Sequence, residues 1–140
     1  MFEAAIVCLA MNIYHEARDQ PRAGQIAVGQ VVMHRVYDDR FPDNVCDVVK
    51  QGPTYAWTED FPVRNRCQFS WYCDGKSDKP KDTEAWDNAM LMAFGVYNGR
   101  VVDLVDGATH YHATYVLPEW AETKTETVRI ADHIFYRWDY

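Results

Sequence analysis

Three short segments of this sequence carry side chains whose types and spacing could perform chemistry. The first is Asn12-Ile13-Tyr14-His15-Glu16-Ala17-Arg18. Steps of three and four residues back from Glu16 lead to Ile13 and Leu9, so a helix here presents a mostly apolar face with a carboxylate at its C-terminal edge. Burial against that face disfavours the charged carboxylate and raises its pKa. Glu16 is therefore predicted to be a catalytic general acid.

The second segment, Cys67-Gln68-Phe69-Ser70-Trp71-Tyr72-Cys73, places amide, hydroxyl and aromatic groups between two cysteines. A sugar needs hydrogen-bonding partners for its hydroxyls and a flat ring to cover its C–H face. The segment supplies both, so we expect four of its residues to bind substrate: Gln68, Phe69, Ser70 and Trp71. The alternative is a tight hairpin whose aromatic side chains fill the core.

The third segment is His110-Tyr111-His112, which we also assign to substrate contact. Residues i and i+2 of a strand face the same side, so the two imidazoles could converge on a metal ion. The pair lacks the spacing and the carboxylate of an H-E-x-x-H zinc motif, and we expect neither a metal nor a cofactor. Two alternatives stay open: a metal-dependent amidase or peptidase that uses His110 and His112, and a nucleophilic cysteine, Cys67 or Cys73, paired with one of these histidines.

Hydrophobic periodicity predicts that helices position most of these groups. Helices are expected over Phe2–Arg18, Ala23–Tyr37, Asp43–Gln51 and Asp82–Asn98, with Asp43 as the N-cap of the third and Gly99 directly after the fourth. In the fourth helix we expect a core-facing stripe of Ala85, Trp86, Ala89, Met90, Ala93 and Tyr97.

The rest of the chain predicts loops and a minor β element. Residues 54–80 are irregular, with at most a short strand at Gln68–Trp71, and three short strands of a small sheet are expected at Thr109–His112, Thr127–Ile130 and His133–Trp138. No internal boundary is visible. The sequence thus predicts one mostly helical α+β domain over residues 1–140.

The composition limits the possible partners. With 48% hydrophobic and 25% charged residues, the chain can bury a sizeable core. The net charge of −7 argues against a nucleic-acid-binding surface. No run reaches the 18 apolar residues of a membrane span, and we expect a monomer.

Four cysteines, Cys8, Cys46, Cys67 and Cys73, allow two disulfides in three pairings. Cys67 and Cys73 lie close in sequence, so their pair is the easiest to close. The alternative is four reduced thiols packed as small hydrophobic side chains.

Six segments, covering nearly the whole chain in order, carry a family resemblance: residues 8–18, 24–32, 41–46, 67–71, 108–113 and 133–136. They resemble the SleB/CwlJ family of cell wall hydrolases, which includes spore-cortex-lytic enzymes. One departure is His34, where relatives usually have Asn. The resemblance implies a lysozyme-like fold and cleavage of peptidoglycan glycan strands between N-acetylmuramic acid and N-acetylglucosamine, with the family's catalytic glutamate at Glu16.

The family is similar to lytic transglycosylases, in which one glutamate acts first as acid and then as base. The muramic C6 hydroxyl attacks its own anomeric carbon and gives a 1,6-anhydro product; a muramidase would use water instead. A one-glutamate mechanism needs no second carboxylate. Asp47, Glu59 and Asp74 are the possible second acids in a mechanism that does need one. We expect Gln68, Ser70 and Tyr111 to meet the charge of the transition state.

The expected partner is therefore the peptidoglycan glycan strand, and the expected source is a phage endolysin or a bacterial wall-remodelling enzyme. The N-terminus has no basic n-region, and Glu3 and Asn12 interrupt its apolar run, so it does not read as a signal peptide. We expect the host cytoplasm before release to the wall, or the cell wall and periplasm if the sequence is a trimmed mature form. A non-catalytic sugar-binding domain is a further alternative.

Overall fold

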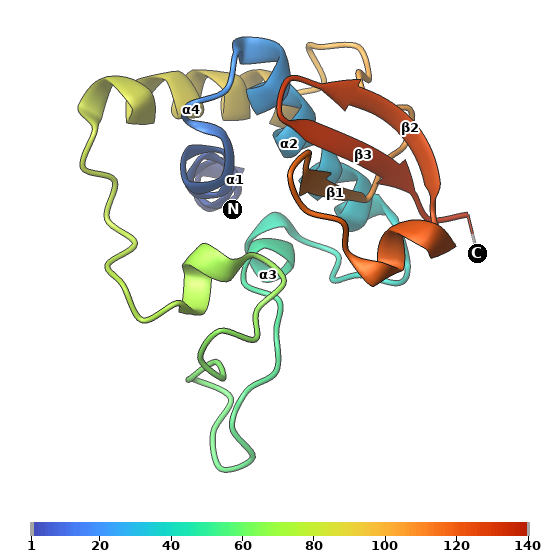
Figure 1. The fold of residues 1–140 in the computed structure, drawn as a ribbon. Helices are drawn as coiled ribbons and strands as arrows, with labels where there is room; N and C mark the ends of the chain where they lie inside the picture. Colours follow the sequence, from blue (N-terminus) through green and yellow to red (C-terminus); the bar gives the residue numbers. More distant parts are fainter. Residues whose placement is uncertain (1, 140) are drawn as a thin grey trace.

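The computed structural model describes residues 2–139, where four α-helices lie beside a small antiparallel sheet (Figure 1). The α-helices are α1 (Phe2–Ala17), α2 (Arg22–Tyr37), α3 (Val45–Val49) and α4 (Thr83–Tyr97). The strands are β1 (His110–Ala113), β2 (Thr125–Ile130) and β3 (His133–Arg137), and two 3₁₀ helices are η1 (Ser70–Cys73) and η2 (Glu119–Thr123).

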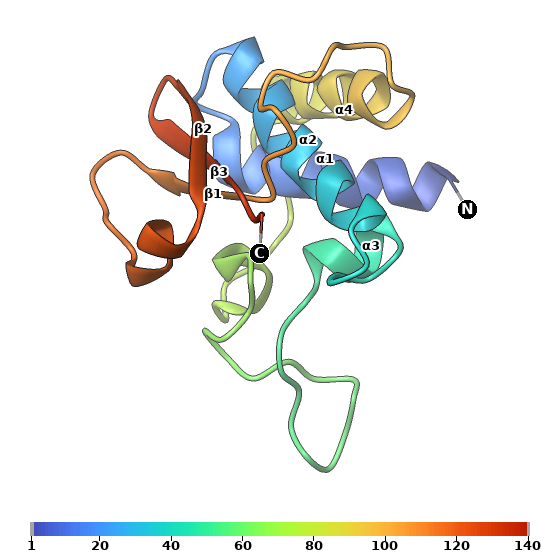
Figure 2. The same cartoon turned by 90° about the vertical axis from the view of Figure 1, so that its right-hand side faces the viewer.

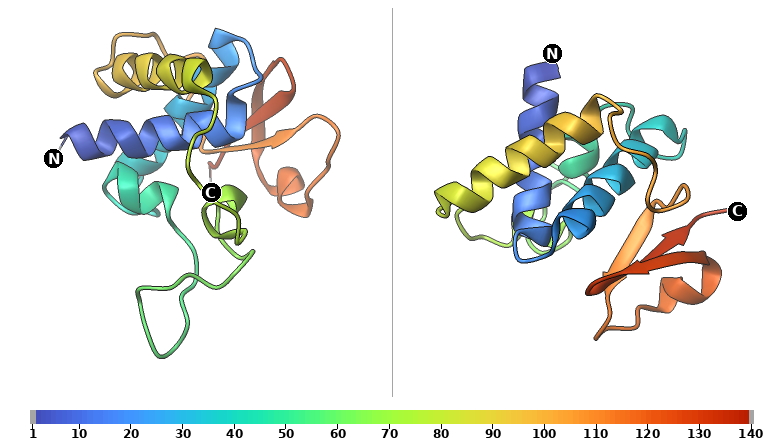
Figure 3. Two further views of the ribbon diagram at one scale, coloured as in Figure 1. Left: turned by 90° about the vertical axis from the view of Figure 1, so that its left-hand side faces the viewer. Right: turned by 90° about the horizontal axis from the view of Figure 1, so that it is seen from above.

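Helix α1 is the centre of the helical part. It contacts α2, α3 and α4, and Figure 3 shows α4 on one side of it and α3 on the other. Leu9 and Ile13 are fully buried in the larger of two core clusters. At Gly29 of α2 a Cβ would lie 3.1 Å from the Ile13 side chain, so the missing side chain lets α2 approach α1 closely.

The sheet has the strand order β1-β3-β2 and covers the C-terminal end of α1 (Figure 2). Phe135 of β3 is fully buried in the second core cluster, together with Ala17 of α1 and Val28 of α2. The turn between β2 and β3 is also tied to the end of α1. Gln20 Nε2 donates to Asp132 Oδ2 (3.1 Å), and the Asp132 N–H donates to Gln20 Oε1 (3.3 Å). The sheet is thereby fixed to the helix that carries Glu16.

The predicted helices and strands are confirmed to within about two residues, except that α3 is shorter than expected. Asp43 is not its N-cap, because Asn44 takes that role: Asn44 Oδ1 accepts the Asp47 N–H at 2.9 Å. A capping oxygen must reach the amide two or three residues ahead, and Asn44 stands at that spacing. No helix in the described part of the chain is long and apolar enough to cross a bilayer.

The strand expected at Gln68–Trp71 is wrong. The chain instead forms η1, with the Tyr72 N–H donating to the Phe69 carbonyl at 3.2 Å. The bridge between Cys67 and Cys73 closes a loop with a sequence separation of only 6, which leaves no length for an extended strand. Alternation of polar and aromatic residues here reflects one turn of tight helix.

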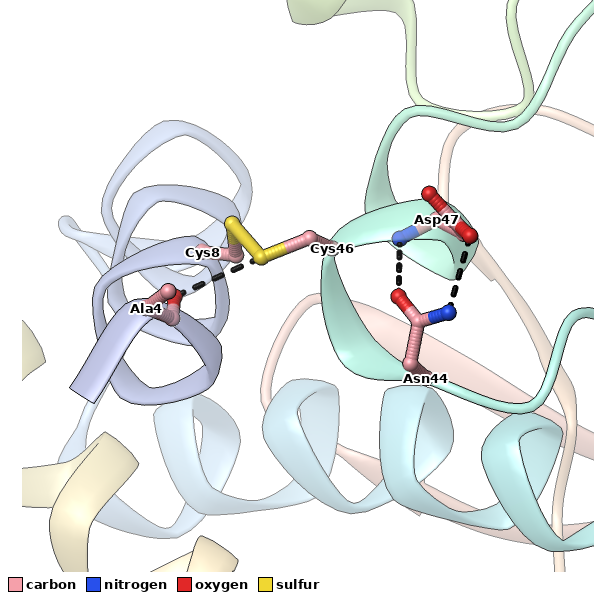
Figure 4. Close-up of a disulfide and its surroundings, with 5 residues drawn as sticks. All are labelled: Ala4, Cys8, Asn44, Cys46 and Asp47. Carbon is pink, nitrogen blue, oxygen red and sulfur yellow. Dashed lines mark hydrogen bonds between the residues drawn. A yellow bond between two sulfur atoms is a disulfide. The ribbon is translucent and has the colours of Figure 1, made fainter. Parts of the chain in front are cut away.

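Both disulfides form, as Cys8–Cys46 and Cys67–Cys73, so the expectation for the second pair is confirmed and the reduced alternative is not. Cys8–Cys46 joins α1 to α3, next to the Asn44 cap (Figure 4). Cys67–Cys73 closes the segment that contains η1. The first bridge thus fixes α3 to α1, and the second holds together the two ends of the segment that forms η1.

Replacing Cys8 and Cys46 together by alanine should lower the free energy of unfolding more than replacing Cys67 and Cys73. The sequence separations are 38 and 6 residues, and loop-closure entropy then gives losses of about 4 and about 2 kcal/mol. Urea unfolding of both double variants measures the difference. Equal losses, or the larger loss for the shorter loop, would contradict this account.

Candidate active site

The last turn of α1 stands between two surface depressions. The first, which we call the sheet-side depression, has a volume of about 510 Å³ and includes Tyr111 and His133 in its lining. The second, the loop-side depression, has about 620 Å³ and is lined by Trp71 and by side chains of residues 74–81. The residues common to both are His15, Glu16 and Arg18. A ligand that occupied both depressions would therefore pass directly over Glu16.

Tyr111 is the hydrogen-bond partner of Glu16. Strand β1 directs the Tyr111 side chain towards α1, where its hydroxyl donates to Glu16 Oε1 at 3.0 Å. The prediction that Tyr111 lies near Glu16 is thus confirmed. Tyr111 bonds only to Oε1 of the carboxyl group, and the second oxygen, Oε2, does not contact the Tyr111 hydroxyl.

Half-buried Glu16 has a raised pKa. Burial at the end of the apolar α1 face disfavours the charged carboxylate and is the largest effect. The hydrogen bond from Tyr111 and the positive charge of Arg35 act in the opposite direction and lower the pKa. Burial outweighs both, so the carboxyl holds its proton to a higher pH than an exposed glutamate. A general acid that later serves as base needs such an intermediate affinity for its proton.

Arg35 of α2 is a buried positive charge beneath this pair. Its Nε donates to the Thr109 carbonyl at 2.7 Å, and its guanidinium carbon lies 4.9 Å from the ring centre of Phe41. Burial lowers the pKa of Arg35 to about 10, while Tyr111 and Glu16 favour its charged form. The guanidinium is therefore charged at neutral pH. Its Nη1 is buried without a hydrogen-bond partner.

One wall of the loop-side depression is built from stacked rings. The Trp71 indole N–H donates to Asn12 Oδ1 at 2.9 Å, and the His15 ring stacks on Trp71 with centroids 4.6 Å apart and planes 15° apart. His15 Nε2 lies 2.8 Å from the Asp78 carbonyl oxygen, which only accepts, so this nitrogen carries the hydrogen. Trp71 is thus held by Asn12 and His15, and His15 is held by Trp71 and the Asp78 carbonyl.

His133 of β3 is a neutral polar group in the sheet-side depression. Its ring packs edge-on against Tyr111, with centroids 5.1 Å apart. Burial lowers the pKa of His133, and this outweighs the opposing effect of Asp132 and Asp19. Its Nδ1 is buried without a hydrogen-bond partner.

Four of the eight predicted site residues come together at the depressions: Glu16, Ser70, Trp71 and Tyr111. Phe69 does not, because its side chain is buried in the core, 5.2 Å from the Arg35 guanidinium carbon. Gln68 lines neither depression either; its backbone N–H donates to the Gln51 carbonyl at 2.9 Å. These two residues support η1 and do not line the groove, the name we use for the two depressions together.

His110 and His112 also lie outside the groove, because alternation along β1 turns both away from Tyr111. His112 Nδ1 lies 2.8 Å from the Ala113 carbonyl and must donate to it, so His112 Nε2 accepts the Tyr136 hydroxyl at 2.8 Å. His110 is enclosed by aromatic rings, and burial with nearby positive charge lowers its pKa to about 4. Both nitrogens of His112 are engaged, which removes it as a free metal ligand.

Within residues 2–139, no group of three or more His, Cys, Asp or Glu side chains is placed to hold a metal ion. Both cysteines of the alternative nucleophile hypothesis are bridged. The amidase and the cysteine-nucleophile alternatives thus find no assembled site in this part of the chain.

Sequence reasoning missed Arg35, His15 and His133 as parts of the site. Arg35 is a charged residue within the apolar pattern of α2, and a charge among residues predicted to be deeply buried is a usable signal. His133 begins a strand that was predicted, but the face it occupies depends on the register Ala113↔His133, which the sequence alone does not give.

Known proteins resemble this chain in sequence and in fold. A family model described as Cell Wall Hydrolase matches residues 19–136, a range that begins just after Glu16. A spore cortex-lytic enzyme of Halalkalibacterium halodurans is 29% identical over 131 residues, which cover 93% of this chain and 34% of the relative. The chain thus spans about a third of that relative's length.

Two solved structures share the fold. The catalytic domain of the germination-specific lytic transglycosylase SleB from Bacillus anthracis matches with a TM-score of 0.66 and 22% identity, over 95% of this chain and 93% of that one. The catalytic domain of the Bacillus cereus SleB protein matches with a TM-score of 0.66 and 23% identity, over 96% and 91%. The predicted lysozyme-like α+β fold is thereby confirmed.

Replacing Tyr111 by phenylalanine should raise the pKa of Glu16 further, because it removes the hydrogen bond that favours the carboxylate while burial persists. NMR titration of the Glu16 side-chain carboxyl measures this. Tyr136→Phe is the matched control, since its hydroxyl contacts His112 and not Glu16. A wild-type Glu16 that titrates below 4.5, or a lower pKa in Tyr111→Phe, would refute the proposed balance.

Glu16 should also make stability depend on pH. Its pKa is 4.5 in the unfolded chain and higher in the folded one, so between these values the folded state binds more protons. The free energy of unfolding therefore falls as pH rises through this window. Glu16→Gln lacks this decrease, and its stability relative to the wild type should grow from below pH 4.5 to neutral pH. Urea unfolding at both ends measures it, with exposed Glu122→Gln as control; parallel wild-type and Glu16→Gln profiles would argue against a desolvated carboxyl.

Proposed function

The chain belongs to the cell wall hydrolase family, and on that premise we propose that it cleaves peptidoglycan glycan strands between N-acetylmuramic acid and N-acetylglucosamine. The observation that carries the proposal is the position of Glu16, a half-buried carboxyl with a raised pKa at the junction of two depressions. A strand bound across both depressions places an internal glycosidic bond beside this acid. The names of the matched relatives, which include a lytic transglycosylase, support the same chemistry.

In the first step the protonated Glu16 carboxyl donates its hydrogen to the glycosidic oxygen, and the bond from the muramic C1 to that oxygen breaks. The leaving sugar departs with a free hydroxyl, and positive charge develops at C1. Glu16 is now a carboxylate, which the Tyr111 hydrogen bond and the Arg35 charge stabilise. The same two groups that oppose the raised pKa thus favour the proton transfer.

In the second step the muramic C6 hydroxyl attacks C1, and Glu16 takes its proton as a base. The product is a 1,6-anhydro sugar, formed without water, and Glu16 returns to its starting state. If water attacks instead, the same proton movements give a reducing end and the reaction is that of a muramidase.

A second carboxylate is not needed for the anhydro route. A retaining glycosidase would need one about 5 Å from the acid. Of the three acids considered from the sequence, Asp74 lines the loop-side depression. Asp47 is bonded to the Asn44 cap, and Glu59 lies in an exposed loop. Because the anhydro route needs no second carboxylate, we assign both proton transfers to Glu16, with Tyr111 and Ser70 as polar groups at the two depressions.

The proposal extends to the setting of the enzyme. We propose a single catalytic domain that acts as a monomer on the wall, either in the manner of a phage endolysin that waits in the host cytoplasm or as a wall or periplasmic enzyme. Its acidic net charge of −7 gives no attraction to nucleic acid.

Glu16→Gln should reduce the release of soluble muropeptides from purified peptidoglycan by roughly 10²–10⁴-fold, the contribution of a positioned general acid. The matched control is Glu122→Gln, an exposed carboxyl of η2, which should remain fully active. Mass spectrometry of the wild-type products should show sugars one water lighter than hydrolysed ones. Full activity in Glu16→Gln would remove this residue from the reaction, and release of stem peptides without glycan cleavage would favour an amidase.

A further inference from the structure

A loop that lines neither depression carries three exposed aromatic side chains. The loop covers residues 54–62, and we call it the aromatic loop. It is closed by the antiparallel bridge Thr54↔Pro62 and by the Tyr55 N–H, which donates to the Phe61 carbonyl at 3.3 Å. Figures 1 and 2 show it projecting away from the helices and the sheet. Its backbone is therefore organised as a short hairpin.

The three rings form a continuous row. Tyr55 and Trp57 stack with centroids 5.9 Å and planes 21° apart, and Trp57 and Phe61 lie 6.2 Å apart. Their exposed fractions are 41%, 75% and 58%. Single exposed apolar residues need no explanation, but a contiguous patch of this kind marks a binding surface.

The base of the aromatic loop contacts the segment that leads into the loop-side depression. Just after the loop, the Asn65 N–H donates to the Cys73 carbonyl at 2.8 Å. The Arg64 guanidinium packs on Gly75, where φ is +81° and a Cβ would lie 2.6 Å from Arg64 Nε. Gly75 directly follows Asp74, which lines the loop-side depression. The base of the loop thus abuts the end of that depression.

The chemistry of the loop favours a saccharide over an anionic lipid surface. Flat aromatic faces cover the C–H faces of sugar rings, and these three rings, unlike the buried Trp71, are open to such contact. Glu59 and Asp60 lie in the loop between Trp57 and Phe61, and these carboxylates would be repelled by an anionic bilayer. The net charge of −7 adds to that repulsion.

We propose that Tyr55, Trp57 and Phe61 form a second glycan-binding surface, which holds the strand beyond the loop-side depression while Glu16 acts on it. The inference rests on the proposed function in one respect, since it assumes that the strand in the groove is a glycan. The surface provides affinity for long strands and takes no part in the proton transfers.

Binding without cleavage tests the surface directly. Sedimentation with purified sacculi measures the affinity of Glu16→Gln and of the same chain carrying Trp57→Ala. We expect the second to bind about tenfold more weakly, the loss typical of an aromatic anchor residue. Tyr37→Ala in the Glu16→Gln chain is the matched control, because Tyr37 is 77% exposed at the end of α2. Equal binding by all three proteins would overturn the proposal, and circular dichroism verifies that each is folded.

Kinetics of the active chain give a second readout. Trp57→Ala should raise KM for long glycan strands about tenfold and leave kcat unchanged. Short glycan fragments confined to the groove should be cleaved as by the wild type. A fall in kcat on both substrates would refute a purely binding role.

The two proposals fail separately. If sacculus binding depends on Trp57 but no glycan bond is broken, the proposed reaction is wrong and the proposed binding surface is supported. If Glu16-dependent cleavage is found but the affinity for sacculi does not change in Trp57→Ala, only the proposed binding surface is wrong. Binding to phosphatidylglycerol vesicles that depends on Trp57 would replace the glycan by a lipid surface and overturn the inference.

Discussion

The hydrogen bond between Tyr111 and Glu16 is the contact on which the site depends. Glu16 comes from the last turn of the central helix and Tyr111 from the first strand of the sheet, so the bond exists only when these two parts are packed together. Tyr111 also packs against both core clusters. The affinity of Glu16 for its proton is therefore set by the tertiary fold rather than by α1 alone.

Arg35 of α2 also interacts with both parts, the helix that carries Glu16 and the strand that carries Tyr111. Its Nε holds the Thr109 carbonyl, directly before β1, and its charge favours the ionised form of Glu16. One side chain thereby positions the strand that carries Tyr111 and tunes the carboxyl that Tyr111 contacts. A buried charge of this kind is costly to leave unpaired, so the nearby Glu16 and Tyr111, which favour the charged form of Arg35, offset part of this cost.

Local patterns in the sequence predicted most of the fold, because helix periodicity and end signals act over a few residues. α2 and α4 follow their apolar patterns, and the strands follow theirs. Glu16 was found in the same way, because it lies at the end of the apolar face of its own helix, and its burial raises its pKa as expected. Gln68 and Phe69 were misplaced because their residue types suit a sugar but do not show which way they face, and the fold buries Phe69 in the core. His133 and Arg35 needed the strand register and the docking of α2, which arise from contacts between distant segments.

The stacked wall of the loop-side depression has a consequence for ligand binding. The Cys67–Cys73 bridge confines η1, Asn12 accepts the Trp71 indole N–H, and His15 covers the Trp71 ring. These side chains have already given up their rotamer freedom before any sugar arrives. Little further entropy is lost when a sugar packs beside these side chains, so this side of the groove is preorganised, and more of the contact energy remains available as affinity.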